Sequence, residues 1–187
     1  MVLANDTHEI RNYRTALHAA HGQGCSTALL LQDDDLYTDQ IFAWLDAALN
    51  RMAEDPKIAL VGGNGGANFV PGRIAAADEG LCSAKFEIWS EGAETRFRIG
   101  SYQEMILSRA TPTADGSRGE FVATVNRAPQ LVSIPWALRL GFFPAELEPY
   151  QYDDDYHGLL AWTNGAKVLH LPTTCKTGDV GTGGMRL

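Results

Sequence analysis

The sequence predicts an α/β fold, built as one domain over residues 1–187, because strand and helix patterns alternate along it. Apolar runs at 27–31, 58–61 and 167–171 are typical of buried strands. Apolar residues recur at helical spacing over residues 9–21 and again from about residue 40 to 54. No internal repeat and no domain linker interrupts this alternation.

The first half of the chain carries clear start and stop signals for these elements. Thr7 or Asp6 precedes the first helix as a capping residue, and Gly22 follows it. Pro56 closes the region of the second helix. We expect irregular structure over residues 71–83.

The second half is predicted from similar signals. Residues 85–89 and 95–99 alternate apolar and polar residues around a turn, which indicates a hairpin. We expect a mobile loop at residues 109–119 and one or two strands within 121–134. A short helix at 135–141 should end at Gly141, and a second helix at 158–165 should end at Gly165. Residues 176–187 are expected to form a flexible tail.

Composition limits the class of protein. The net charge of −8 argues against nucleic acid as the main partner. No apolar run approaches the roughly 20 residues that span a bilayer, and the start of the chain does not look like a signal peptide. The three cysteines match neither a disulfide framework nor a zinc pattern. We therefore expect a cytoplasmic protein without a transmembrane segment, or one that works at the inner face of the membrane.

Three consecutive carboxylates, Asp33, Asp34 and Asp35, follow the first predicted strand. In an extended chain Asp33 and Asp35 point to the same side, and a divalent cation with oxygen ligands would neutralise them. Two other interpretations stay open. The acids could form a solvated turn or cap the next helix, as Asp39 also could. They could also belong to a phosphatase motif, although the glycine of Asp-x-Asp-Gly-Thr is missing.

A glycine cluster at residues 62–66 follows the second predicted strand. Such clusters can hold phosphate through backbone N–H groups, but no Gly-x-Gly-x-x-Gly spacing and no Lys-Ser/Thr helix start accompany this one. We interpret it as a tight exit from the strand, and direct contact with a ligand is the alternative.

Five segments, taken in order, resemble the GT-A fold glycosyltransferases of the family 2 type. These are an Arg-Asn helix with later alanines, a strand ending in Asp-x-Asp and a Val-Gly-Gly strand. They continue with a Ser-Ile-Pro segment followed by Leu-Gly-Phe-Phe, and with an Asp-Asp cluster before a helix that leads to Gly-Ala-Lys-Val. They stand at residues 11–20, 30–35, 58–63, 133–143 and 153–168. The Asp-Asp-Asp-Leu and Tyr-Asp-Asp forms are similar to the galactofuranosyltransferase branch. The resemblance implies a GT-A-like mixed sheet flanked by helices.

The resemblance also implies a reaction, the transfer of a sugar from a nucleotide-diphosphate donor to a carbohydrate or other hydroxyl acceptor. Mn²⁺ or Mg²⁺, held by Asp33 and Asp35, would stabilise charge on the leaving diphosphate. Asp154 or its neighbour Asp153 would be the general base. Donor-binding roles would fall to Arg11, Asn12 and Asp34. Acceptor-binding roles would fall to Trp136, Tyr152 and Trp162, unless these aromatic residues belong to the core.

The sequence also departs from the family pattern. The matched region starts almost at residue 8, so we expect the chain to lack the N-terminal βα units that bind the nucleotide. Gly178 stands where family members often carry a metal-binding His, and Leu160 where they often carry Arg. Unpaired strand edges seek partners, which predicts a homo-oligomer. The alternative function is a non-catalytic GT-A-like metal- or sugar-binding remnant that needs a partner chain.

Overall fold

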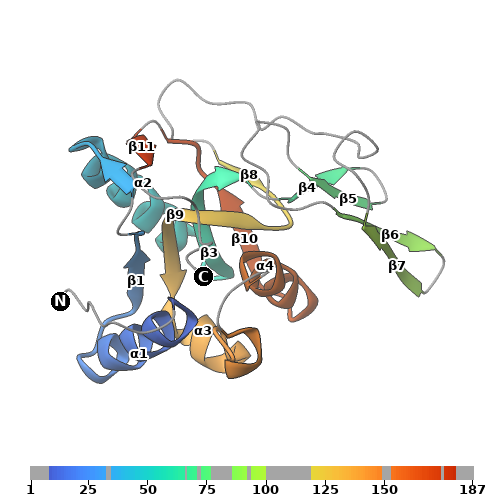
Figure 1. Cartoon of the computed structure of the whole chain (residues 1–187), viewed down its shortest axis with the longest axis horizontal. Coiled ribbons are helices and arrows are strands. Elements are labelled where there is room, and N and C mark those ends of the chain that lie inside the picture. The colour runs from blue at the N-terminus through green and yellow to red at the C-terminus, as the bar shows by residue number, and fades with distance from the viewer. Residues whose placement is uncertain are drawn as a thin grey trace.

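The computed structural model describes residues 9–32, 35–65, 67–70, 73–76, 86–91, 94–99, 119–148, 153–173 and 175–179. They form a mixed α/β fold around a five-stranded sheet with the order β1-β9-β3-β10-β8 (Figure 1). The bounds of these strands are Thr27–Leu30 for β1, Val125–Ser133 for β9, Ile58–Gly65 for β3, Lys167–His170 for β10 and Glu120–Phe121 for β8.

Strand directions decide where the chemistry of this fold gathers. Strand β9 is antiparallel to both β1 and β3, and β10 is parallel to β3. Strands β1, β3 and β10 therefore run in one direction, and their carboxyl ends share one edge of the sheet. Ligands of open α/β sheets bind beyond the carboxyl ends of such strands.

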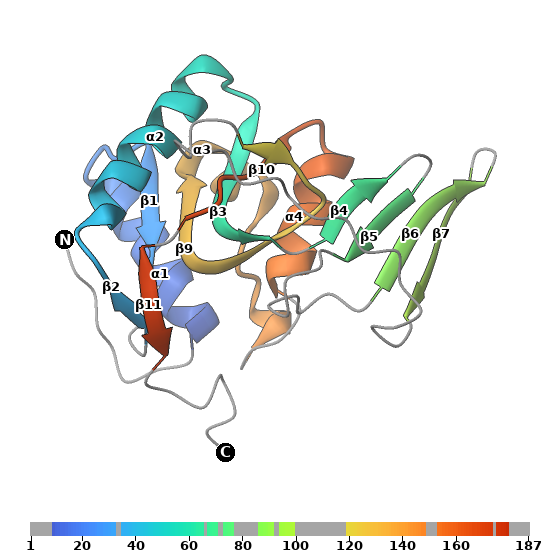
Figure 2. The ribbon, with the colours of Figure 1, turned by 90° about the horizontal axis from the view of Figure 1, so that it is seen from above.

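Three helices bring their N-termini to the same edge. They are α1 (Glu9–Gly22), α2 (Gln40–Glu54) and α4 (Asp153–Thr163), which precede β1, β3 and β10 through short connections. A short connection makes each helix run opposite to its strand. The helix starts therefore lie beside the strand ends, as Figure 2 shows for α4 and β1.

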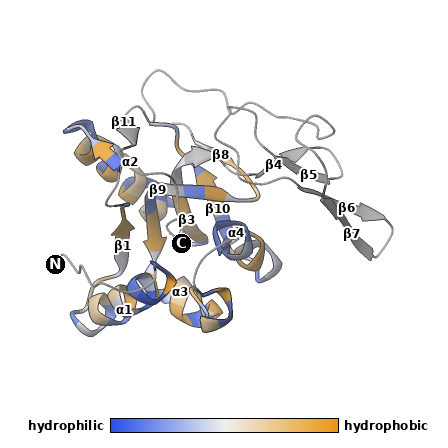
Figure 3. Cartoon of the chain, in the orientation of Figure 1, coloured by the Kyte–Doolittle hydropathy of each residue, from blue (hydrophilic) through white to orange (hydrophobic). Residues whose placement is uncertain are grey.

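Helices cover both faces of the five-stranded sheet. On one face α1, α3 (Ile134–Leu140) and α4 pack on an apolar cluster that includes Ile10, Leu60, Val132 and Phe143. On the other face α2 packs through Trp44 and other residues against Leu131 and Leu169. Figure 3 shows the hydrophobic character of β1 and of the part of β9 beside it. The strands read as near-continuous apolar runs because both faces are buried.

Helix α3 stands at the opposite, amino edge of the sheet, because it follows the carboxyl end of the antiparallel strand β9. Proline occupies its first turn, where the missing N–H costs nothing. Gly141 ends it with a φ of 68°, a left-handed conformation that glycine adopts without strain. A short 3-10 helix, Ala145–Leu147, follows.

Two further sheets extend the fold. Strands β4 (Ala67–Val70), β5 (Arg73–Ala76), β6 (Phe86–Glu91) and β7 (Glu94–Ile99) pair antiparallel and project away from the helices in Figure 1. Strand β2 (Asp35–Tyr37) pairs antiparallel with β11 (Lys176–Asp179), with Asp35 opposite Asp179. The second sheet ties the end of the described chain to Asp35–Tyr37.

The predicted helices at residues 9–21, 40–54 and 135–141 are confirmed within a residue or so, as is the hairpin now seen as β6 and β7. The left-handed Gly165, with a φ of 78°, lies where the sequence predicts a helix end. The predicted loop at 109–119 lies outside the described residues apart from Gly119. No helix in the described ranges has the length and apolar character needed to cross a membrane.

Three predictions about local structure are wrong. Residues 73–76 form strand β5 in a region expected to be irregular, and 176–179 form β11 in the expected flexible tail. The acidic residues Asp153–Asp155 form the first turn of α4 instead of preceding it.

The glycine cluster gives a fourth correction, because β3 continues through Gly65. Asn64 and Gly65 pair with β9, so their backbone groups stay in the sheet. A Cβ on Gly62 would lie 2.4 Å from the Cβ of Val125, and one on Gly63 would lie 2.6 Å from Thr173. Glycine serves here for close packing within the sheet.

Candidate functional site

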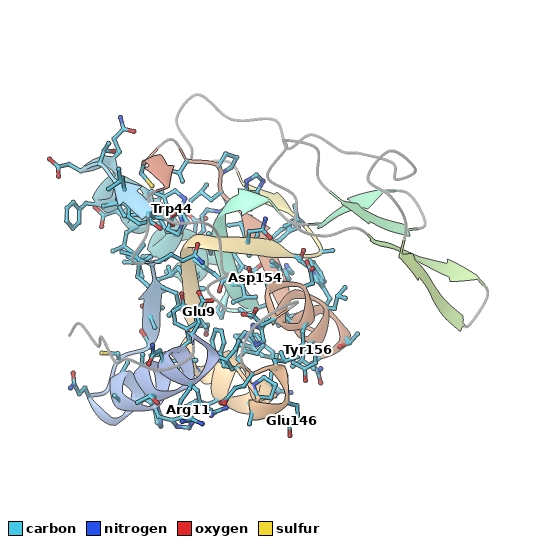
Figure 4. The ribbon with its side chains drawn as sticks, viewed as in Figure 1. Glu9, Arg11, Trp44, Glu146, Asp154 and Tyr156 are labelled. Atoms are coloured by element: carbon cyan, nitrogen blue, oxygen red, sulfur yellow. The ribbon has the colours of Figure 1, made fainter. Side chains whose placement is uncertain are left out.

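The candidate site is the carboxyl edge of the sheet between the starts of α1 and α4. In Figure 4, Glu9 of α1 and Asp154 of α4 lie toward the space between these two helices, whereas Arg11 and Tyr156 lie farther from that space. The turn after β1, which leads to Asp35, opens onto the same edge. The fold thus brings Asp35 and the acidic first turn of α4, more than a hundred residues apart in sequence, to one side of the molecule (Figure 2).

The first turn of α4 holds three carboxylates in different environments. Asp153 and Asp155 are buried, with 1% and 5% of their surface exposed, while Asp154 is only partly buried. The hydroxyl of Thr124 donates a hydrogen bond of 2.9 Å to Oδ1 of Asp155. Acidic residues at a helix start are favourable, because the backbone N–H groups there carry partial positive charge.

Burial raises the pKa of Asp155 from 3.8 to about 6. The hydrogen bond from Thr124 opposes that rise, and the nearby charge of Asp153 adds to it. Asp155 therefore titrates in the mildly acidic range. Asp155 has a structural role, and Asp154 is the most accessible of the three carboxylates.

Gly158 lets α4 approach the sheet closely enough to form this turn. A Cβ at this position would lie 2.6 Å from the carbonyl oxygen of Ala123 and 2.8 Å from the Cα of Thr124. Both are backbone atoms, which do not move aside cheaply. The glycine thus fixes the distance between the acidic turn and the start of β9.

The turn after β1 is described only in part. Asp33 and Asp34 lie outside the described residues, and Asp35 is the first residue of β2. The hydroxyl of Tyr37 donates a hydrogen bond of 2.7 Å to Oδ2 of Asp35. Burial, together with this bond and the Asp35 charge, raises the pKa of Tyr37, so its proton stays in place.

The side chains of the described ranges do not by themselves complete a metal site. No group of three or more His, Cys, Asp or Glu residues among them is arranged to hold a metal ion. Asp35 offers the hard oxygen ligand that Mn²⁺ and Mg²⁺ prefer. The other predicted ligand, Asp33, lies outside the described residues.

A small polar network joins α1 to the same turn. The hydroxyl of Tyr13 donates to Oε1 of Glu9 at 2.9 Å, and Nε2 of Gln32 donates to the same oxygen at 3.3 Å. The Tyr13 hydroxyl also lies 3.4 Å from the carbonyl of Leu31. These contacts hold the chain between β1 and the acidic turn against the start of α1.

Arg11, expected at the donor, extends instead toward Glu148. Its Nη2 lies 3.4 Å from that carboxylate, and its side chain is 55% exposed. Arg14 makes the closer ion pair with Glu148, at 2.7 Å, and holds the pKa of Glu148 below its usual value. Asn12 lies beside Arg11 on α1 and is partly buried. The structure leaves the donor-binding roles of Arg11 and Asn12 as predictions.

Two of the aromatic residues expected at the acceptor, Trp136 and Trp162, do not lie beside Asp154. The Trp136 indole donates to the carbonyl of Pro56 at 2.9 Å, at the amino edge of the sheet. The Trp162 indole donates to the carbonyl of Val122 at 2.7 Å, near the end of α4. Tyr152 lies outside the described residues. Trp136 and Trp162 thus have structural contacts away from the carboxyl edge.

Several polar residues near the site were missed in the sequence. Gln130 and His170 are buried on the face that carries α4, one strand to either side of Gly62. Gln130 Oε1 and His170 Nδ1 have no hydrogen-bond partner among the described residues, and burial lowers the pKa of His170. The available signal was a polar residue inside a predicted buried strand. Thr124 and His157 gave no such signal.

In comparisons with known proteins, no family model and no curated protein matches this chain.

Proposed function

We propose that the protein is a glycosyltransferase that moves a sugar from a nucleotide-diphosphate donor to a hydroxyl acceptor with the help of Mn²⁺ or Mg²⁺. The observation that carries this proposal is the shared edge. Asp35, at the turn after β1, and Asp154, at the start of α4, lie at the carboxyl edge of one mixed sheet. Sugar transfer needs a group at the leaving diphosphate and a base at the acceptor, in one place.

Asp154 is the proposed general base. Asp153 is almost fully buried, and Asp155 is buried and already accepts a hydrogen bond from Thr124. Asp154 is only partly buried, so it is the most accessible of the three carboxylates for an acceptor hydroxyl. In the proposed step it takes the proton of that hydroxyl. The oxygen then attacks the anomeric carbon from the face opposite the diphosphate, whose oxygen leaves with the electron pair of the broken bond, and the configuration inverts.

Asp33 and Asp35 are the proposed ligands of the divalent cation, with Asp34 and Asn12 near the donor. A cation bound there would supply positive charge to a diphosphate. Tyr37 supports this role for Asp35, because its hydrogen bond to Oδ2 fixes the orientation of the carboxylate. Trp136 and Trp162 have no part in this proposal.

A second candidate function is a non-catalytic metal- or sugar-binding module of the same fold. One observation favours it. Arg11, the predicted cationic contact for the donor, forms an ion pair with Glu148. A module without turnover would keep the acidic turn but have no use for Asp154.

Calorimetry tests the proposal. Titration of UDP into the protein with and without Mn²⁺ should show binding that depends on the metal and is lost in Asp33→Ala and Asp35→Ala. Asp46→Ala is the matched control, because this exposed carboxylate stands in the middle of α2. Asp154→Asn should bind Mn²⁺ and UDP like the wild type but lose turnover. Failure of the wild type to bind Mn²⁺ would overturn both candidate metal functions.

A further inference from the structure

Phe143, in the loop between α3 and α4, has an unusual backbone conformation. Its φ of 58° is the only positive value at a non-glycine residue in the described part of the chain. A left-handed conformation costs a residue with a side chain about 1–2 kcal/mol. Phe143 is fully buried, so solvent does not hold this conformation. Something in its surroundings must stabilise it.

Side chains from two different helices hold the backbone of Phe143. Its N–H donates a hydrogen bond of 2.8 Å to Nε2 of His157 in α4. Its carbonyl accepts one of 3.0 Å from Nη1 of Arg14 in α1. Arg14 is itself held by its ion pair with Glu148. Both polar groups of this one residue therefore link the two helices that border the candidate site.

His157 is well fixed in this arrangement. It is fully buried, and its ring centroid lies 4.7 Å from that of Phe142 and 4.4 Å from that of Phe143. Because Nε2 accepts the Phe143 N–H, the imidazole is neutral, with its proton on Nδ1. His157 follows Asp154 by three residues, which places the two about one helical turn apart on α4.

We infer that His157 is a positioning residue for Asp154, which it serves by fixing the first turn of α4 to the loop at Phe143 and, through Arg14, to α1. The inference rests on the proposed function, since it assigns His157 a part in the work of the same base. His157 touches neither substrate nor metal. Its contribution is the angle and depth of the helix start that carries Asp154. Small displacements of a catalytic group lower rates steeply, by as much as about a hundredfold for 1 Å.

The test uses hydrolysis of a nucleotide sugar, in which water replaces the unidentified acceptor. UDP-galactose and UDP-glucose are the probes, with Mn²⁺ present and UDP release as the readout. His157→Phe keeps a ring of similar size but loses the acceptor, and should lower kcat by about tenfold to a hundredfold with an unchanged KM for the nucleotide sugar. His157→Gln offers an oxygen near the position of Nε2 and should recover most of the loss. Tyr156→Phe is the control on the neighbouring residue and should match the wild type.

A second measurement keeps the inference testable if no hydrolysis is found. Titration of the Asp155 carboxyl by NMR reports the position of the same helical turn, because burial sets its pKa of about 6. His157→Phe should move this pKa back toward 3.8, and His157→Gln should not. Equal pKa and equal kcat in the wild type and His157→Phe would overturn the inference. Loss of activity with equal effects of His157→Phe and His157→Gln would also overturn it, since the acceptor atom would then not matter. Absence of hydrolysis in the wild type, with the NMR shift present, would count against the proposed function alone.

Discussion

The hydroxyl of Thr124 and the carboxylate of Asp155 form a buried hydrogen bond of 2.9 Å that joins the start of β9 to the first turn of α4. Thr124 is itself fully buried. The bond therefore ties the start of β9, the strand between β1 and β3, to the helix that carries Asp154.

Thr124→Val keeps the shape of the side chain and removes the hydroxyl. The carboxylate of Asp155 then loses its donor in a buried place, which should lower the free energy of unfolding by about 1–3 kcal/mol. Urea denaturation measures the change. Thr163→Val is the control, because the exposed Thr163 hydroxyl bonds to carbonyls of its own helix and accepts only a long bond of 3.4 Å from the Asn164 amide. A loss no larger than that of the control would contradict the role given to this bond.

Asp155 should make stability depend on pH in a direction unusual for a carboxyl group. Its folded pKa of about 6 lies above the ordinary 3.8, so the folded state binds the proton more tightly. Its contribution to stability is complete below about pH 4 and is lost as pH rises through about 6, with an upper limit of about 3 kcal/mol. Asp155→Asn mimics the protonated form.

Unfolding free energies of wild type and Asp155→Asn between pH 4 and 7.5 provide the measurement. The variant should gain stability relative to the wild type as pH rises, and the difference should level off above about pH 7. Two parallel curves would mean that the folded protein does not raise the pKa of Asp155.

Gly158→Ala should destabilise the protein, although the same change stabilises most helices. The added methyl group would meet backbone atoms of Ala123 and Thr124 at 2.6 and 2.8 Å, so α4 must shift. We expect a loss of about 1–3 kcal/mol, measured by thermal or urea unfolding. Gly22→Ala is the matched control, because nothing lies within 4 Å of a Cβ at the end of α1. Equal stability of the two variants would show that the contact at Gly158 relaxes freely.

Tyr37→Phe tests whether the hydrogen bond from Tyr37 orients the Asp35 carboxylate for binding a cation. Removal of the hydroxyl frees Oδ2 and lets the carboxylate turn away, so Mn²⁺ affinity should fall by about tenfold or more. Calorimetry with Mn²⁺ measures this directly. Phe42→Tyr serves as a control for altered aromatic surface, because Phe42 is 66% exposed on α2. Unchanged affinity in Tyr37→Phe would separate the hydrogen bond from metal binding.

The sequence predicted helices and turns well where the signal was local. Helical spacing marked α1 and α2, and Gly141 and Gly165 marked helix ends, because these features depend on neighbours within a few residues. The acidic cluster at 153–155 was separated from its helix because three aspartates suit a loop as well as a first turn.

Pairing between distant segments was beyond local signals. Strand β9 lies between β1 and β3, and its pairing keeps Gly65 in the sheet. The residues near Gly65 in sequence do not indicate that its pairing partner is Val125. The same holds for β11, which pairs with β2 across more than a hundred residues.

The candidate site was predicted in part. The sequence singled out Asp35 and Asp154, and the strand directions place both at one edge. Nothing in the sequence beside His157 indicates that it is buried, because the rings that bury it come from Phe142 and Phe143, on a separate loop. Trp136 illustrates the opposite case, since an aromatic residue next to a family-like motif turned out to bond to Pro56 at the far edge.

The most direct test of the central claim is the effect of bound Mn²⁺ on backbone NMR signals. Paramagnetic Mn²⁺ broadens the signals of nuclei close to it. If the acidic turn and the start of α4 serve one site, Mn²⁺ should broaden the amide signals of Asp153–Asp155 and spare the indole signal of Trp136, and Asp35→Ala should abolish the effect. Broadening that leaves Asp153–Asp155 untouched, or that persists unchanged in Asp35→Ala, would contradict the account.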